Sequence, residues 1–291
     1  MASSCQTIGQ IIGIFISTSV YINVSYYKLI KLNTYFFILG LVFIIATVLL
    51  LFIDEEKDED NDTLGLIETL KRVKQIFVNK NIRQFVGILL ISQIGVIFFS
   101  KISILVMNEK GLSQELLTNI STCLIPIEVY VSYYLSKSNE KLLHNYLYGF
   151  CGLIGTAILD LILINSVEYI PRIYLIAILI ILNSLKIWLS LMCFTGVSGF
   201  FYKICDSKIG ATYITALNSV NNMASKWPGI FIFSLVDYFG YQSVGILSII
   251  YSISFYLLFE KNLKKLDLLE NDQWEIKNMT EVLDYSSDKE N

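Results

Sequence analysis

The sequence contains few of the residues on which most catalytic and metal-binding sites depend. Only one of its 291 residues is a histidine, His144, which stands near the start of an apolar segment where we expect a solvated loop. The sequence shows no Ser-His-Asp order, no metal-ligand spacing, no phosphate-binding loop and no haem signature. We therefore predict that the chain is not an enzyme and that it binds no metal and no cofactor.

Paired cysteines and an excess of positive charge are also lacking. The five cysteines are scattered, without the spacing of a metal or redox site, and we interpret them as small buried apolar residues: Cys5, Cys123, Cys151, Cys193 and Cys205. The net charge of -3 at pH 7 is too small to indicate a nucleic-acid partner. These absences argue against metal, redox and nucleic-acid-binding functions.

Apolar residues, by contrast, are abundant. They make up 54% of the chain, and the mean hydropathy of +0.59 is above that usual for a soluble domain. A helix of about 20 apolar residues is long enough to cross a bilayer. Eight windows reach roughly that length: 6–26, 34–53, 84–107, 115–135, 145–165, 172–195, 209–236 and 242–260. We predict an all-α polytopic membrane helix bundle with about eight transmembrane helices.

The windows and the polar stretches between them divide the chain into four parts. These are residues 1–53 with two windows, a polar linker at 54–83, residues 84–260 with six windows, and a polar tail at 261–291. The linker opens with the acidic run Asp54–Asp62, and residues 64–78 have the pattern of an amphipathic helix lying at the lipid headgroups. Most of the 22 Lys and Arg residues fall on the linker's side of the membrane, so both termini are predicted to be cytosolic.

One window carries a continuous polar face. On a helical wheel of ~100° per residue, seven polar residues fall within a sector of roughly 140°: Thr212, Thr215, Asn218, Ser219, Asn222, Ser225 and Lys226. Asn221 falls outside this sector. A polar face inside a bilayer either forms hydrogen bonds to a neighbouring helix or lines a water-filled cavity. Pro228, just beyond the face, lacks a backbone donor and predicts a kink.

The same window contains the run Gly210-Ala211-Thr212-Tyr213-Ile214-Thr215-Ala216-Leu217-Asn218, followed by Trp227-Pro228 and by Asp237. This pattern resembles the signature helix of the acetyl-coenzyme A transporter family, a branch of the major facilitator superfamily. The chain departs from the family pattern at Ala211, where the family has glycine, and over Asn222-Met223-Ala224-Ser225, where it has Asn-Leu-Gly-Gly. Extended from Cys5 to about Lys265, the resemblance implies family helices five to twelve. A partial major facilitator fold would follow, with a complete C-terminal six-helix half and two helices of the N-terminal half.

The resemblance implies transport of acetyl-CoA from the cytosol into the lumen of the endoplasmic reticulum, by alternating access between two halves. The implied partners are acetyl-CoA or CoA as the transported solute and the lipid bilayer, with a homo-oligomer also possible. Because four helices of the family's N-terminal half have no counterpart here, we expect a fragment or truncated form that does not transport alone. Two schemes for driving this transport fit the sequence equally well: antiport against free CoA and coupling to protons.

The polyanionic coenzyme requires cations and hydrogen-bond donors, and its adenine suits aromatic rings. The implied substrate-binding residues are Lys226, Asn218, Asn222, Thr215, Thr212, Tyr213 and Trp227 in the polar window, with Lys101 and Lys186 in two others. Trp188 is a further ring on which adenine could stack. Glu128 and Asp160 are embedded acids and the candidates for proton coupling. The alternative for all embedded charges is that they pair with one another and hold the bundle together.

Three other functions fit the same composition. A related permease could carry another solute, such as a muropeptide-like compound. A non-transporting membrane scaffold could use the helices to hold a partner. A membrane acetyltransferase is the weakest alternative, because only Glu128 and Asp160 could serve as its acid and base.

Overall fold

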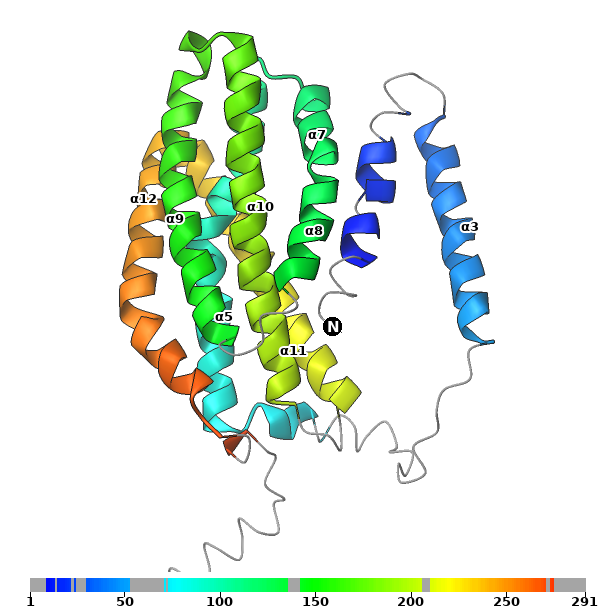
Figure 1. The fold of residues 1–291 in the computed structure, drawn as a ribbon, viewed down its shortest axis with the longest axis vertical. Coiled ribbons are helices and arrows are strands. Elements are labelled where there is room, and N and C mark those ends of the chain that lie inside the picture. Colours follow the sequence, from blue (N-terminus) through cyan, green and yellow to red (C-terminus); the bar gives the residue numbers. More distant parts are fainter. Residues whose placement is uncertain are drawn as a thin grey trace, which may run out of the picture. The chain divides into compact units, whose positions relative to one another are not determined.

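The computed structural model describes residues 9–13, 15–21, 24, 30–52, 71, 73–135, 142–205, 210–270 and 273–274. Every regular element within these ranges is helical (Figure 1). The elements are η1 (Phe15–Val20), α3 (Leu32–Leu50), α5 (Lys80–Ile97), η2 (Phe98–Ile102), α6 (Ser103–Glu109), α7 (Gln114–Cys123), α8 (Ile125–Leu135), α9 (Leu142–Ser166), η3 (Val167–Tyr169), α10 (Arg172–Lys203), α11 (Gly210–Ala224) and α12 (Trp227–Asp267). The predicted all-α class is confirmed.

Five stretches of the described chain are long and apolar enough to cross a membrane. They are Leu32–Leu49, Lys80–Glu109, Leu142–Tyr169, Arg172–Lys203 and Thr212–Asp267. A sixth forms if α7 and α8, which meet at a bend of 41°, make one span. A polytopic membrane helix bundle is therefore confirmed, whereas the predicted count of eight stays a prediction.

Several sequence predictions fall outside the described residues. The acidic run Asp54–Asp62 does, as do most of the predicted amphipathic helix at 64–78 and residues 275–291 of the polar tail. The first predicted span, residues 6–26, is described only in part. The four-part division of the chain consequently stays a prediction.

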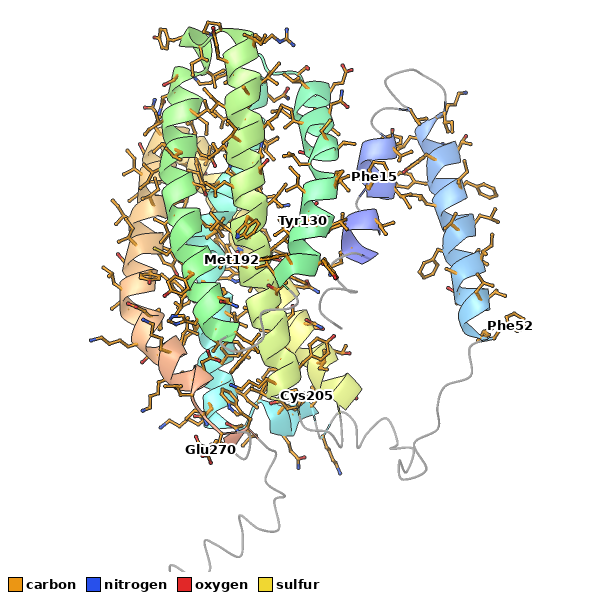
Figure 2. All side chains as sticks on the ribbon, viewed as in Figure 1. Phe15, Phe52, Tyr130, Met192, Cys205 and Glu270 are labelled. Carbon is orange, nitrogen blue, oxygen red and sulfur yellow. The ribbon has the colours of Figure 1, made fainter. Side chains whose placement is uncertain are left out.

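The chain divides into two compact units. The first unit comprises Met1–Asp62, Phe99–Asn139 and Gly149–Thr195, and the second comprises Thr63–Phe98, Glu140–Tyr148 and Gly196–Asn291. Within the first unit, α3 exposes apolar side chains along its whole length, such as Phe37 at 73% and Phe43 at 72%. Phe52, just beyond its end, is labelled in Figure 2. Such a surface suits hydrocarbon better than water.

Close packing of α9 on α10 organises the rest of the first unit. A Cβ added at Gly149 of α9 would lie 2.7 Å from the Leu189 carbonyl oxygen, so only glycine allows this approach. Met192 of α10, labelled in Figure 2, packs against a buried cluster that includes Val131 of α8. Small residues thus bring α9 and α10 together, and apolar side chains attach α8 to α10.

In the second unit α5 forms the centre of the packing. Its first turn is capped by Asn79, whose Oδ1 accepts a hydrogen bond of 2.9 Å from the Asn81 backbone nitrogen. Phe85 is fully buried and meets the ring of Phe200 edge-on at 4.9 Å between centroids. Phe200 also meets the buried ring of Trp274 edge-on, with 5.3 Å between centroids.

The long helix α12 reverses direction near Gly240. This residue has φ 74° and ψ 157°, which lies outside the helical region. Positive φ values of this kind favour glycine. Trp227 and Tyr251 lie on opposite sides of it, and a continuous helix would hold them about 36 Å apart. Both nevertheless donate hydrogen bonds to neighbouring carbonyls of α5, at 2.9 Å each. The chain therefore folds back at Gly240, between the predicted windows 209–236 and 242–260.

Candidate functional site

The polar face of α11 lies opposite a buried apolar face. Tyr213, Leu217 and Ala224 are each 0% exposed and lie on the side that packs against α5. Four members of the polar face are exposed: Thr215, Ser219, Asn222 and Lys226. The other three lie half-buried beside them: Thr212, Asn218 and Ser225. The structure thus gives α11 the two-sided character that the sequence predicts.

Two hydroxyls of the polar face bond within their own helix. Ser219 donates to the Thr215 carbonyl oxygen at 2.8 Å, and Ser225 donates to the Asn222 carbonyl oxygen at 2.8 Å. These bonds are local and do not join α11 to a neighbouring helix. The oxygens of both hydroxyls can still accept hydrogen bonds from a solute.

The predicted kink at Pro228 is confirmed as a break between two helices. α11 ends at Ala224, and α12 begins at Trp227 with Pro228 in its first turn. Lys226 lies in the break itself, where its backbone nitrogen bonds to the Met223 carbonyl oxygen at 2.9 Å. The carboxyl end of one helix and the amino end of the next therefore meet at an exposed lysine. The partial negative charge at the carboxyl end of α11 and the partial positive charge at the amino end of α12 therefore both fall at this lysine.

The two predicted aromatic residues of this window are both tied into the packing. Tyr213 is fully buried, on the side of α11 away from the polar face. Trp227 is half-buried, and its Nε1 donates a hydrogen bond of 2.9 Å to the Leu90 carbonyl oxygen. Its ring meets Phe231 edge-on, with 5.8 Å between centroids. Tyr213 therefore offers no open face to a base, whereas the half-buried Trp227 is held through its indole nitrogen.

The remaining candidate residues belong to the first unit. Lys101 is exposed and lies in the π-helical turn η2, a widened turn of a kind frequent at functional sites. Lys186 of α10 forms an ion pair with Asp160 of α9, whose side chain is 0% exposed. Glu128 is half-buried on α8. Two of the embedded charges are therefore paired with each other. This pairing fits the alternative in which embedded charges hold the helix bundle together.

Three details of the sequence interpretation are wrong. His144 is not in a solvated loop, because α9 already begins at Leu142, and its half-buried ring meets Tyr148 edge-on at 4.6 Å. Cys123 and Cys151 are exposed on α7 and α9, although the sequence favoured burial. An apolar helix surrounded by lipid has no need to bury its small apolar residues, which explains the difference.

Comparison with known proteins finds a family similarity in the carboxyl-terminal part of the chain. Residues 138–276 match the family model of acetyl-coenzyme A transporter 1. This range contains α9 to α12, including the polar face and the break at Lys226. The family resemblance read from the sequence is confirmed for this part. Placement in the major facilitator superfamily and the numbering of family helices stay predictions.

Two fungal relatives extend the similarity towards the amino terminus. An uncharacterised protein of Schizosaccharomyces pombe is 26% identical in an alignment 252 positions long, which covers 81% of this chain and 48% of the relative. An uncharacterised membrane protein of Saccharomyces cerevisiae is 23% identical in an alignment 314 positions long, which covers 82% of this chain and 56% of the relative. The chain thus spans about half the length of the curated relatives it matches. No solved structure matches it.

Proposed function

We propose that the chain takes part in transporting acetyl-CoA across a membrane, and that the polar face of α11 contacts the solute. The exposed lysine at the break between α11 and α12 carries the proposal. It lies inside the range that matches the acetyl-coenzyme A transporter family, and its charge is opposite to that of the coenzyme. The exposed amide and hydroxyl groups along α11 provide further donors for a polar solute.

The chemistry of the solute accounts for this arrangement. Acetyl-CoA carries a pyrophosphate and a 3′-phosphate, whose oxygens bind ammonium groups and the amino ends of helices. Lys226 supplies the ammonium group. The start of α12 adds little to it, because Pro228 has no backbone N–H and the Gly229 nitrogen already bonds to the Lys226 carbonyl oxygen. Asn218, Asn222 and Thr215 extend along the helix towards its amino end, within reach of amide groups in the pantetheine arm. A polyanion of this length would lie along the helix.

Direction, location and coupling are also part of the proposal. Transport would run from the cytosol into the endoplasmic reticulum lumen, by alternating access around a site within the bilayer. Exchange for CoA and coupling to protons through Glu128 remain the two schemes for driving it. Asp160, whose carboxylate already pairs with Lys186, is the less available proton carrier. Vesicles preloaded with CoA distinguish the two schemes. If transport is an exchange, internal CoA will accelerate the uptake of acetyl-CoA even when no pH gradient is present, whereas proton coupling predicts no such acceleration.

The test of the proposed function is Lys226→Gln, which removes the charge and keeps a side chain of similar length. A charge-assisted hydrogen bond is worth about 1.5–3 kcal/mol, so the affinity for acetyl-CoA should fall about tenfold or more. Ile214→Val, a change outside the polar face, is the matched control and should leave the affinity unchanged. Binding is measured by titration of the purified protein at its full natural length.

Analogues of the coenzyme then identify the phosphate that Lys226 contacts. If the partner is the 3′-phosphate, Lys226→Gln will lose affinity for acetyl-CoA and not for the 3′-dephospho analogue. Equal affinity of the parent and Lys226→Gln for acetyl-CoA would make Lys226 a structural residue. Failure of the parent to bind acetyl-CoA, or to carry it into liposomes above the level of empty liposomes, would overturn the proposed function itself.

A further inference from the structure

Two side chains of α12 bond to adjacent carbonyls of α5. Trp227 Nε1 donates to the Leu90 oxygen and Tyr251 Oη donates to the Ile91 oxygen, each at 2.9 Å. Both carbonyls lie inside α5, where backbone nitrogens already serve as helical donors. The side chains come from opposite sides of the turn at Gly240. Both segments of the α12 hairpin are thereby attached to one short stretch of α5.

Close backbone packing reinforces the second attachment. A Cβ at Gly95 of α5 would lie 2.6 Å from the Ser248 carbonyl oxygen and 3.2 Å from the Tyr251 ring. Gly95 therefore lets the second segment of α12 approach α5 closely enough for the phenol to reach its carbonyl. Along the first segment, Trp227 makes the corresponding contact at the amino end of the helix.

The first attachment adjoins the exposed lysine. At a helix break the regular backbone bonds are interrupted, so the direction of the chain depends on contacts with other helices. Trp227 follows Lys226 directly, and its indole bond holds that point of the chain on α5. The half-buried indole faces α5, while the ammonium group of Lys226 belongs to the exposed polar face. The hydrogen bond from Trp227 to α5 thus fixes the position of the neighbouring Lys226.

We propose that Trp227 and Tyr251 are positioning residues, which clamp both segments of α12 to α5 and so hold Lys226 in place for the solute. The inference rests on the proposed function for its solute, although the clamp itself does not. It gives Trp227 a role different from that of a stacking surface for adenine. A stacking ring needs an open face, whereas a clamp needs the indole N–H and its acceptor, which the structure supplies.

The first experiment tests the clamp without any solute. Hydrogen exchange is measured over residues 221–232 in the full-length protein, in Trp227→Phe and in Tyr251→Phe. Tyr251→Phe keeps the ring, Trp227→Phe exchanges the indole for a smaller aromatic ring, and each removes one donor. We therefore expect exchange around the break to accelerate about fivefold, the equivalent of one ordinary hydrogen bond. The matched controls are Trp188→Phe and Tyr238→Phe, whose rings lie outside the clamp. Exchange as slow as in the parent in both clamp variants would overturn the clamp.

The second experiment tests whether the clamp acts through Lys226. The affinity for acetyl-CoA is measured for Trp227→Phe alone and in the Lys226→Gln background. We expect a loss of about fivefold when the lysine is present and no further loss when it is absent, because the two residues act as a unit. An equal loss in both backgrounds would mean that Trp227 only stabilises the fold. Full affinity in Trp227→Phe, with loss in Trp227→Leu in both backgrounds, would identify a stacking surface instead.

The two experiments separate failure of this inference from failure of the proposed function. A parent protein that does not bind acetyl-CoA refutes the proposed solute and, with it, the role of the clamp in binding. The hydrogen-exchange result still decides whether Trp227 and Tyr251 hold the break on α5. A parent protein that binds acetyl-CoA while Trp227→Phe binds equally well and exchanges equally slowly refutes the positioning role alone.

Discussion

Gly95 gives the sharpest test of how α5 packs against the second segment of α12. A Cβ added there would lie 2.1 Å from Ser252 Oγ and 2.6 Å from the Ser248 carbonyl oxygen. Ordinary contacts of a Cβ begin at 3.4 Å, so the carbonyl contact alone requires the helices to separate by about 0.8 Å. The serine hydroxyl can rotate away from an added methyl group, but the backbone carbonyl cannot.

We expect Gly95→Ala to lower the free energy of unfolding by about 1–3 kcal/mol, the usual cost of excess volume in a packed core. Gly87→Ala is the matched control, because Gly87 lies exposed in the same helix with nothing within 4 Å of an added Cβ. There the methyl group raises helix propensity, so stability should stay the same or rise slightly. The measurement is the fraction of folded protein that gel filtration recovers after heating in detergent.

A double variant separates the two close contacts. Ser252→Ala removes the oxygen at 2.1 Å and leaves the carbonyl at 2.6 Å, so adding it to Gly95→Ala should restore part of the lost stability. Full restoration would show that the backbone of α12 is not in the way of a methyl group. If Gly95→Ala and Gly87→Ala proved equally stable, the close approach of α5 and α12 would be refuted.

Three further predictions concern other contacts. Gly149→Ala should destabilise the protein by about 1–3 kcal/mol, because its Cβ would meet a backbone carbonyl of α10. Gly155→Ala, whose Cβ would lie in open space, should leave the stability unchanged. The recovery of folded protein after heating is compared for the two variants. Lys186→Met should destabilise by about 3–5 kcal/mol by leaving Asp160 buried and unpaired, and adding Asp160→Asn should recover much of this in the same assay. Trp274→Ala should weaken docking of the segment after α12 by about 3–5 kcal/mol, measured as faster hydrogen exchange there.

The sequence predicts the helices well, because a bilayer leaves the backbone few alternatives. Each apolar window from residue 34 onward overlaps a helix or a bent pair of helices. The break before Pro228 was also predictable, since proline lacks the donor that a continuing helix requires. The prediction of a loop at His144 is wrong because the apolar pair Leu142 and Leu143 already belongs to α9. Helix ends are set by local bonds that hydropathy does not register.

The contacts around the candidate site were less predictable than the helices. The polar face of α11 follows from helical periodicity, but the partners of Trp227 and Tyr251 are backbone carbonyls, which no side-chain pattern reveals. The sequence marked Asp160 and Lys186 as embedded charges and gave no means of choosing their partners, which the structure supplies. A tyrosine in an apolar window was the one available signal for Tyr251, because a phenol in hydrocarbon requires an acceptor.

The polar face and the helix break occur together for a physical reason. Pro228 removes the N–H that would have bonded to the Ala224 carbonyl, and an unsatisfied carbonyl in hydrocarbon costs several kcal/mol. A break is therefore stable only where water or a polar solute reaches it, or where other helices hold the chain. In the proposed site, the exposed polar residues of α11 suit the first condition, and the indole bond of Trp227 to α5 satisfies the second. A site that exchanges water for solute on one side of the break consequently needs a fixed contact on the other.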